Sequence, residues 1–442
     1  MTIQLSDHFT YRRLLRFTLP SIAMMIFTSI YGIVDGFFVS NFVGKTAFAA
    51  VNFIMPFLMI LGAFGFMFGT GGSALIAKTM GEGDMPRANR LFSLLTYTSA
   101  SLGTLVAVLG IIFIRPVASL LGAEGEMLND CVTYGRIILL ALPFFMLQME
   151  FQSFFVTAEK PQTGLYATVA AGVTNMVLDA LFIAVFRWGI VGAAAATATS
   201  QLVGGVIPLV YFGRKNTSLL RLGRTVFDGR ALLKTCTNGS SELMSNLSMS
   251  LVGMLYNVQL MKYAGEDGVA AYGVLMYVCF IFIAIFIGYS IGVAPVVGYN
   301  LGAENYDELK SLLRKSLALL AVSSVGMVVL SLALAKPLSL LYVGYDPALF
   351  EMTLRGFVFC SFSFLFSGLA IFGSGFFTAL NNGLVSATMS FLRTLLFQVT
   401  SILLLPLLWE LDGIWASIVV AELAAAAVTV AFLVGLRKKY HY

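Results

Sequence analysis

Charged residues are scarce in this chain of 442 residues. Asp, Glu, Lys and Arg make up only 11% of it, whereas an ordinary soluble domain contains about 25%. Hydrophobic residues make up 59%, and a soluble fold of this size has no interior large enough for so many apolar side chains. Together with a mean hydropathy of +0.90, this composition predicts an integral membrane protein.

Histidine and cysteine are also sparse. The two histidines, His8 and His441, stand near the ends of the sequence, which argues against a buried proton relay and against a histidine-ligated haem or iron site. The four cysteines occur singly, with no CxxC pair, so the sequence supports neither a disulfide framework nor a zinc site. No complete Walker sequence is present. We therefore expect no resident cofactor, no enzyme and no nucleotide-driven pump.

Long apolar stretches fill most of the chain, and each exceeds the roughly 20 residues that span a bilayer. Their helical length excludes an outer-membrane barrel, whose strands alternate over about ten residues. We expect an all-α polytopic membrane protein with an N-lobe at 1–212, a linking loop at 213–235 and a C-lobe at 236–442, six transmembrane helices in each lobe. The twelve predicted spans are 14–39, 50–77, 91–114, 132–157, 164–186, 190–212, 236–262, 269–297, 312–335, 353–379, 384–408 and 412–436.

Basic residues are distributed unevenly between the predicted loops. Of the 27 Lys and Arg residues, 19 fall on the side that holds both termini and the 213–235 loop, and 7 fall on the other side. Cytoplasmic loops collect such residues, so the net charge of +5 indicates topology rather than nucleic-acid binding. We predict a multi-pass protein of a prokaryotic plasma (inner) membrane with cytoplasmic termini.

The two halves resemble each other at a shift of 221 residues. Gly71 then pairs with Gly292, Gly81 pairs with Gly302, and basic–proline pairs also coincide. Chance similarity between apolar segments explains matched leucines better than it explains these matches. Two parallel six-helix repeats are typical of carriers that rock one lobe against the other around a central cavity.

Several polar residues lie deep in the predicted spans, where an ionisable group costs roughly 2.5–3.5 kcal/mol. At 1.5 Å per residue, Asp35 lies roughly 32 Å along the first span and Asp179 about 22 Å along the fifth, both from the cytoplasmic end. Thr197 lies about 10 Å from the outer end of the sixth span, and Asn175 lies one turn before Asp179. These four side chains are expected to share the outer half of the membrane.

Two carboxylates, one amide oxygen and one hydroxyl form a set of hard oxygen ligands. Such a set suits Na⁺, or it shares a proton where burial and like-charge proximity favour protonation of one carboxyl. The same oxygens serve both ions, so the choice between Na⁺ and H⁺ stays open. The structural alternative places Asp35 in a wet outer mouth and has Asp179 cap a kink or bond to a hydroxyl.

Four other ionisable residues in the spans have two interpretations each. Arg393 and Glu422 lie at similar depth near mid-membrane, where they form a neutralising pair or Arg393 contacts an anionic substrate group. Glu150 and Glu242 lie roughly two turns from cytoplasmic helix ends. Each either faces an inward-open cavity and attracts cations or lies in water as an ordinary helix-end carboxylate.

The first span carries features that allow it to move. Pro20 removes a backbone hydrogen bond and either acts as a hinge or marks an ordinary tolerated kink. Gly32 and Gly36 flank Asp35 and are expected to let another helix approach closely there.

These motifs resemble those of the multidrug and toxic compound extrusion (MATE) family, and the resemblance covers nearly the whole chain. Its most specific part is Thr18-Leu19-Pro20 followed fifteen residues later by Asp35, then Asn175-x-x-x-Asp179 and Thr197. The pattern is similar to the DinF-like branch. That resemblance implies that Asp35, Asn175, Asp179 and Thr197 bind the coupling Na⁺ or H⁺, with Tyr134 as a weaker candidate neighbour.

The sequence departs from the other branch of the family. The NorM-like branch has an acidic residue in helix 10, whereas 353–379 contains none. Glu242 stands too early in the seventh span to match that branch's glutamate. A cation site in the C-lobe is therefore not expected.

The resemblance implies a secondary active antiporter that exports cationic or amphiphilic compounds in exchange for Na⁺ or H⁺ by alternating access. Its partners are expected to be small amphiphilic substrates and the lipid bilayer; the exchanged ion stands in place of a cofactor, and we expect a monomer. The alternative is a dedicated exporter or flippase of lipid-linked precursors or metabolites within the same superfamily, but only Arg393 is available at depth to bind a pyrophosphate. A major-facilitator carrier would show a basic–glycine signature where Gly81-Glu82-Gly83-Asp84 stands, and an intramembrane enzyme has no acid pair other than Asp35 and Asp179.

Overall fold

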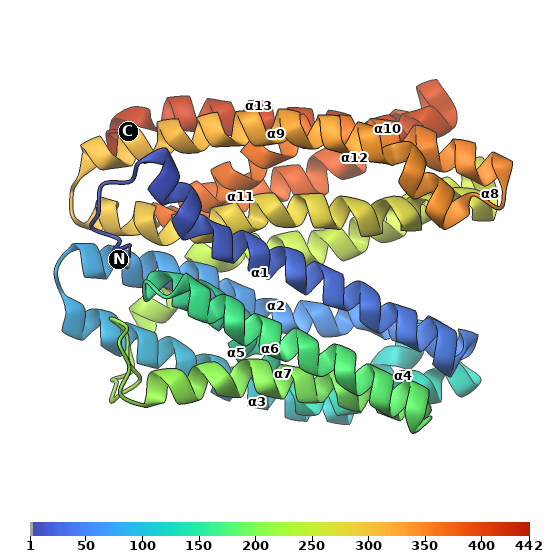
Figure 1. Cartoon of the computed structure of the whole chain (residues 1–442), viewed down its shortest axis with the longest axis horizontal. Helices are drawn as coiled ribbons and strands as arrows, with labels where there is room; N and C mark the ends of the chain where they lie inside the picture. The colour runs from blue at the N-terminus through green and yellow to red at the C-terminus, as the bar shows by residue number, and fades with distance from the viewer. Residues whose placement is uncertain (1–2) are drawn as a thin grey trace.

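The computed structural model describes residues 3–442, and its helices form two bundles that stand side by side (Figure 1). A chain in a bilayer has no water to satisfy its backbone, so the long apolar runs form helices, which satisfy it internally. The N-lobe contains α1 (Tyr11–Phe38), α2 (Lys45–Gly81), α3 (Met85–Leu120), α4 (Gly125–Leu140), α5 (Leu142–Thr157), α6 (Pro161–Asp179) and α7 (Gly189–Gly213). The C-lobe contains α8 (Gly229–Gly302), α9 (Tyr306–Val343), α10 (Pro347–Ala379), α11 (Gly383–Phe391), α12 (Phe397–Leu404) and α13 (Pro406–Gly435), followed by the short α14 (Arg437–Tyr440).

The helices supply twelve membrane spans within residues 3–442, as the sequence predicts. Ten are individually long and apolar enough to cross a bilayer, and α4 with α5 makes one further span that is bent by 57°. The 74-residue α8 breaks at Gly265, whose φ of 64° is not helical, so it supplies two spans. Because α8 begins at Gly229, the link between the lobes is 214–228, shorter than expected.

The repeat is visible in the backbone as well as in the sequence. The turn after α2 has a positive φ at Gly83 (85°), and the turn 221 residues later has one at Glu304 (55°). The turn after α5 matches in the same way, with Glu159 at 62° and Asn381 at 57°. The two halves therefore share one architecture down to the conformation of their turns.

Paired glycines let the lobes pack tightly at the end of the molecule that carries the chain termini, which we call the closed end. A Cβ at Gly81 in α2 would lie 2.0 Å from the carbonyl oxygen of Tyr299 in α8. A Cβ at Gly302 in α8 would lie 2.0 Å from the carbonyl oxygen of Lys78 in α2. The repeat relates these two contacts, since each partner stands three residues before the matching glycine. Only glycine permits so close an approach of two backbones.

The lobes diverge toward the opposite, open end (Figure 1). A Cβ added at Gly32 or Gly36 in α1, or at Gly253 or Gly273 in α8, would meet no other atom within 4 Å in the described part of the chain. The expectation that Gly32 and Gly36 admit a helix close to Asp35 is therefore wrong. The lobes are apart at this depth, so no partner helix reaches that face of α1.

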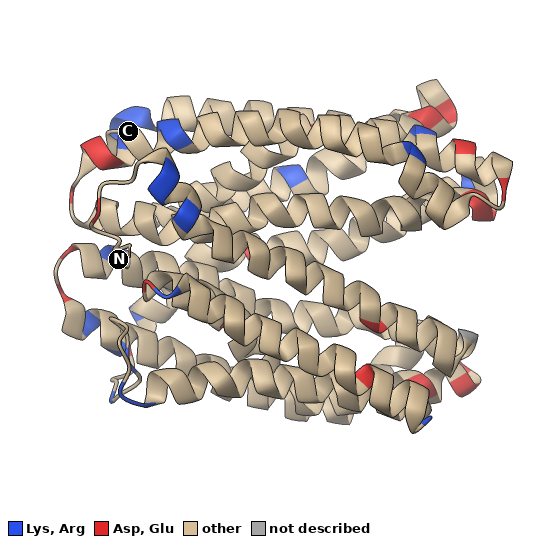
Figure 2. Ribbon diagram, in the orientation of Figure 1, with Lys and Arg blue, Asp and Glu red and all other residues tan. Residues whose placement is uncertain are grey.

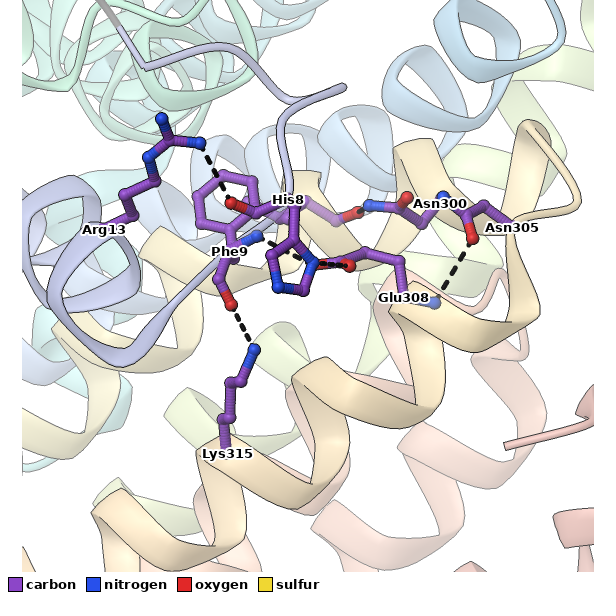
Figure 3. A network of polar contacts seen from close by, with 8 residues as sticks. His8, Phe9, Arg13, Asn300, Asn305, Glu308 and Lys315 are labelled. Carbon is purple, nitrogen blue, oxygen red and sulfur yellow. Dashed lines mark hydrogen bonds and ion pairs between the residues drawn. The ribbon is translucent and has the colours of Figure 1, made fainter.

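Residues 3–10 form a strap that ties the two lobes together at the closed end (Figure 3). The backbone N–H of Leu5 donates to the Glu159 carboxylate of the N-lobe at 2.7 Å. The N–H of Phe9 donates to Glu308 in α9 of the C-lobe at 2.9 Å, and the other carboxylate oxygen of Glu308 meets His8 Nδ1 at 2.6 Å. Leu5 and Phe9 are fully buried, so the strap is part of the packed structure.

Two of the cysteines are not isolated. Cys279 in α8 and Cys360 in α10 are paired through their sulfur atoms inside the C-lobe, whereas Cys131 and Cys236 are free. The expectation that no cysteines pair is therefore wrong for the first two. They are 81 positions apart in the sequence, so no local spacing motif could reveal their contact.

Candidate cation site

Charged side chains gather near the two ends of the molecule and leave the middle of the helices almost uncharged (Figure 2). Asp35, in the last turns of α1, and Asp179, at the end of α6, are exceptions. Both helices start at the closed end, so both carboxyl groups lie in the half of the N-lobe that faces the open end.

Four side chains from three helices meet at this level, and we call them the N-lobe oxygen cluster: Asp35, Asn175, Asp179 and Thr197. The Thr197 hydroxyl in α7 donates to Asp35 Oδ1 at 3.4 Å and accepts from Asn175 Nδ2 at 3.5 Å. The carboxyl groups of Asp35 and Asp179 lie close enough to interact directly. The structure thus brings together all four residues that the sequence places at one depth.

The N-lobe oxygen cluster is rich in acceptors and poor in donors. Asp179 is 0% exposed and Asn175 is 2% exposed. Among residues 3–442, no hydrogen-bond partner is found for Asn175 Oδ1 or for either carboxylate oxygen of Asp179. An unpaired buried acceptor costs about 1–3 kcal/mol. A proton, or a small cation that prefers oxygen ligands, removes that cost when it binds between the two carboxyl groups.

Two tyrosines lie next to the cluster. Tyr134 in α4 is fully buried and its hydroxyl neighbours Thr197, so the sequence suggested the right neighbour. The sequence analysis missed Tyr31, which stands one helical turn before Asp35 and lies beside Gln148 of α5. A search at four-residue spacing from Asp35 would have found it, because residues i and i+4 share a helix face.

Both helices that carry the carboxyl groups change geometry beside them. α6 ends at Asp179 and continues as the π-helix η2 (Ala180–Val185), and α1 passes into the π-helix η1 (Val39–Val43) four residues after Asp35. π-helical turns are rare and recur at functional sites. α1 stays helical through Pro20, so a hinge at that residue remains a prediction.

In the C-lobe, Arg393 forms a two-point ion pair with Glu422. Its Nε and Nη2 atoms donate to the two carboxylate oxygens at 3.0 Å each. Arg393 lies in the π-helix η3 (Leu392–Leu396) and Glu422 lies in α13. Of the two interpretations of Arg393, the structure shows the neutralising pair. Glu242 in α8 is half-buried and within electrostatic reach of Arg393.

Glu150 in α5 fits neither of its predicted surroundings. It is 0% exposed, so its carboxyl group faces neither water nor an open cavity in this arrangement. The cause is tight packing, because a Cβ on Gly69 of α2 would lie only 3.0 Å from the Cα atom of Glu150. Depth along the helix was predicted correctly, but the direction in which the side chain points was not.

Two repeated six-helix lobes that meet at one end and diverge at the other, with ionisable side chains buried inside them, define a membrane carrier rather than an enzyme. The MatE family model matches the chain twice, at residues 20–181 and 243–404. The chain belongs to the MatE family, whose members are transporters. One model matching both halves also confirms the internal repeat.

Relatives and solved structures cover nearly the whole chain. The multidrug export protein MepA of Staphylococcus haemolyticus is 25% identical over 432 residues, which cover 97% of this chain and 94% of the relative. A crystal structure of MATE in complex with MaL6 superposes with a TM-score of 0.92 at 21% identity, covering 98% of each chain. An outward-facing conformation of a multidrug resistance MATE family transporter of the MOP superfamily superposes with a TM-score of 0.91 at 22% identity, again covering 98% of each chain. These structures share the twelve-helix, two-lobe fold.

Proposed function

We propose that this chain exports cationic or amphiphilic organic compounds from the cell and exchanges them for Na⁺ or H⁺ bound at the N-lobe oxygen cluster. The observation that carries the proposal is the surplus of buried acceptors around Asp35 and Asp179, which a cation or a proton would satisfy. The naming of relatives as multidrug export proteins supports the class of substrate. We take the closed end as cytoplasmic, because the predicted loops on that side hold most of the Lys and Arg residues.

The exchanged ion acts on helix positions in this proposal. Asp35 belongs to α1, whereas Asp179 and Thr197 belong to α6 and α7, so an ion held between the two carboxyl groups draws α1 toward the other two helices. Asp35 and Thr197 are half-buried rather than fully buried, which gives an ion a route from the open end. An ion that binds one arrangement of the lobes more tightly than the other shifts the population toward it, and its gradient then drives substrate outward.

The pairing of Arg393 with Glu422 weighs against a flippase for lipid-linked precursors. Such a substrate carries a pyrophosphate, which needs basic groups free to bind it. Arg393 already spends its Nε and Nη2 donors on a carboxylate. This observation favours the export of cationic or amphiphilic compounds over the alternative.

Transport of a fluorescent cation in everted membrane vesicles tests the proposed function. A Na⁺ gradient and a pH gradient are imposed separately, each directed out of the vesicle lumen, on wild-type protein and on Asp179→Asn. We expect one gradient to drive uptake into the lumen and Asp179→Asn to abolish it while membrane insertion stays normal. Undiminished gradient-driven uptake by the variant would refute the role of the N-lobe oxygen cluster.

A further inference from the structure

Glu150 is a fully buried carboxyl group that the proposed cation site does not use. Its Oε1 and Oε2 atoms have no hydrogen-bond partner within residues 3–442. The Ser99 hydroxyl of α3 lies beside the carboxyl group and is the side chain that interacts with it. A carboxylate ion in an apolar interior needs a cation or several donors close by. With one hydroxyl as its neighbour, Glu150 is stable in the protonated, uncharged form.

The helices packed against α5 hold their charged groups away from Glu150. On α2 and α3, Lys78 and Arg90 each stand nine residues from the positions that face Glu150, which is roughly 13 Å along a helix. Glu242 of α8 interacts with Arg393 instead. The remaining ionisable side chains near this part of the N-lobe are directed elsewhere: Tyr97 to the Gly223 carbonyl, Tyr166 to the surface, Tyr211 against Phe155 and Asp179 to the N-lobe oxygen cluster.

Buried hydroxyl groups lead along α5 from Glu150 to the closed end. Ser153 and Thr157 follow Glu150 at i+3 and i+7, which is one face of a helix, and they are 4% and 0% exposed. Thr157 meets the hydroxyl of Ser73 in α2 at 2.6 Å. Gly69 of the same helix packs on Glu150, so α2 follows this face of α5 from the carboxyl group to the helix end.

A second row of buried hydroxyls runs along α3. Thr96 and Ser93 precede Ser99 in steps of three residues, so neighbouring members are adjacent on the helix surface, and all three are 1% exposed or less. The row ends at the link between the lobes, where Ser93 Oγ accepts from the Gly223 N–H at 3.0 Å. Since α2, α3 and α5 pack against one another, we call the two rows together the hydroxyl seam: Ser73, Ser93, Thr96, Ser99, Ser153 and Thr157.

We propose that Glu150 is a proton-binding site, separate from the N-lobe oxygen cluster, and that it exchanges its proton with the closed-end side of the membrane through the hydroxyl seam. A hydroxyl group accepts one proton while it donates another, so a row of hydroxyls passes a proton without admitting a metal ion. One proton leaves the carboxyl group and one water molecule beyond the seam receives it. The proposal rests on the proposed function for its role, which is to make an ion-coupled exporter sensitive to cytoplasmic pH.

Infrared spectroscopy of the purified protein tests the site without any transport. We expect the wild type at neutral pH to show a protonated-carboxyl carbonyl band that Glu150→Gln removes and that shifts when water is replaced by D₂O. Glu351→Gln, which changes an exposed glutamate, should leave that band unchanged. Identical bands in wild type and Glu150→Gln, or a Glu150 band that does not shift in D₂O, would overturn the proposal. If Glu150→Gln does not fold, Glu150→Asp should instead move the band rather than remove it.

Everted vesicles test the role in transport, with a permanently charged quaternary substrate so that the substrate itself does not titrate. We expect wild-type uptake to depend on the pH of the medium, which bathes the cytoplasmic face, and Glu150→Gln to lose that dependence but keep its response to the lumenal ion. Wild-type dependence on medium pH retained in Glu150→Gln would overturn the proposal. Absence of gradient-driven uptake in the wild type would refute the proposed function instead, and the infrared result would then decide Glu150 alone.

Discussion

Arg393 and Glu422 show what a pair of charges requires inside this molecule. Their side chains are 18% and 8% exposed, and they face each other in the C-lobe. Two parallel hydrogen bonds fix the planar guanidinium against the carboxylate. A second pair, Arg355 with Asp412, is 64% and 36% exposed and provides a matched comparison, because it has the same chemistry with much more of its surface uncovered.

We expect Arg393→Ala to lower the free energy of unfolding by about 3–5 kcal/mol, because it leaves the Glu422 carboxylate buried and unpaired. Arg355→Ala should cost only about 0–1 kcal/mol, since an exposed pair contributes little. Thermal unfolding of the two purified variants in one detergent measures the difference. Replacing both Arg393 and Glu422 by leucine should recover most of the loss. Equal losses from the two arginine variants would contradict this account of the pair.

Depth and direction were not equally predictable for single residues. Counting residues at 1.5 Å each placed Asp35, Asn175, Asp179 and Thr197 at one level, and the structure joins them by hydrogen bonds. The same arithmetic could not show that Glu150 points into the packed interior of the N-lobe. That direction depends on how α2 and α3 are rotated against α5, which a single sequence does not encode in any local pattern.

Paired close contacts between α2 and α8 hold the closed end together. Gly81 and Gly302 allow the two backbones to touch there, and the strap of residues 3–10 joins both lobes over the same end (Figure 3). These contacts belong to one arrangement of the lobes. A transporter that opens to the cytoplasm has to separate them.

We expect Gly302→Ala to disfavour the closed end by about 1–3 kcal/mol, because the new methyl group meets the backbone oxygen of Lys78, which cannot move aside alone. Distances between spin labels at the exposed positions Arg87 and Lys310 should shift toward longer values. Gly326→Ala is the control, since a Cβ there meets no described atom within 4 Å. An unchanged distance distribution in Gly302→Ala would show that these contacts do not limit opening.

The sequence predicted the existence and order of the helices better than their details. Apolar length located all twelve spans, including the two that make up α8. It did not predict the π-helices η1, η2 and η3, because such turns arise from packing rather than from residue preference. It also missed the strap, whose buried Leu5 and Phe9 occur in a short polar-looking segment with no periodic pattern.

At the scale of the whole molecule, the duplicated design explains why the lobes meet at one end and diverge at the other. Both halves contribute the same glycine contact at the closed end, and the MatE family model matches both. The halves differ in their polar interiors. The N-lobe holds two neighbouring carboxyl groups and a surplus of acceptors, whereas the C-lobe neutralises Glu422 with its own Arg393. On the proposed function, the N-lobe therefore binds the exchanged ion.

The central claim is that the exchanged ion and the organic substrate are coupled through the N-lobe oxygen cluster. Binding of a fluorescent cationic amphiphile to the purified protein, titrated with Na⁺ and with H⁺, tests it most directly. We predict that one of these ions weakens substrate binding, that the substrate weakens binding of that ion by the same factor, and that Asp179→Asn removes both effects. A substrate affinity that neither ion changes in the wild type, or that changes equally in Asp179→Asn, would contradict the claim.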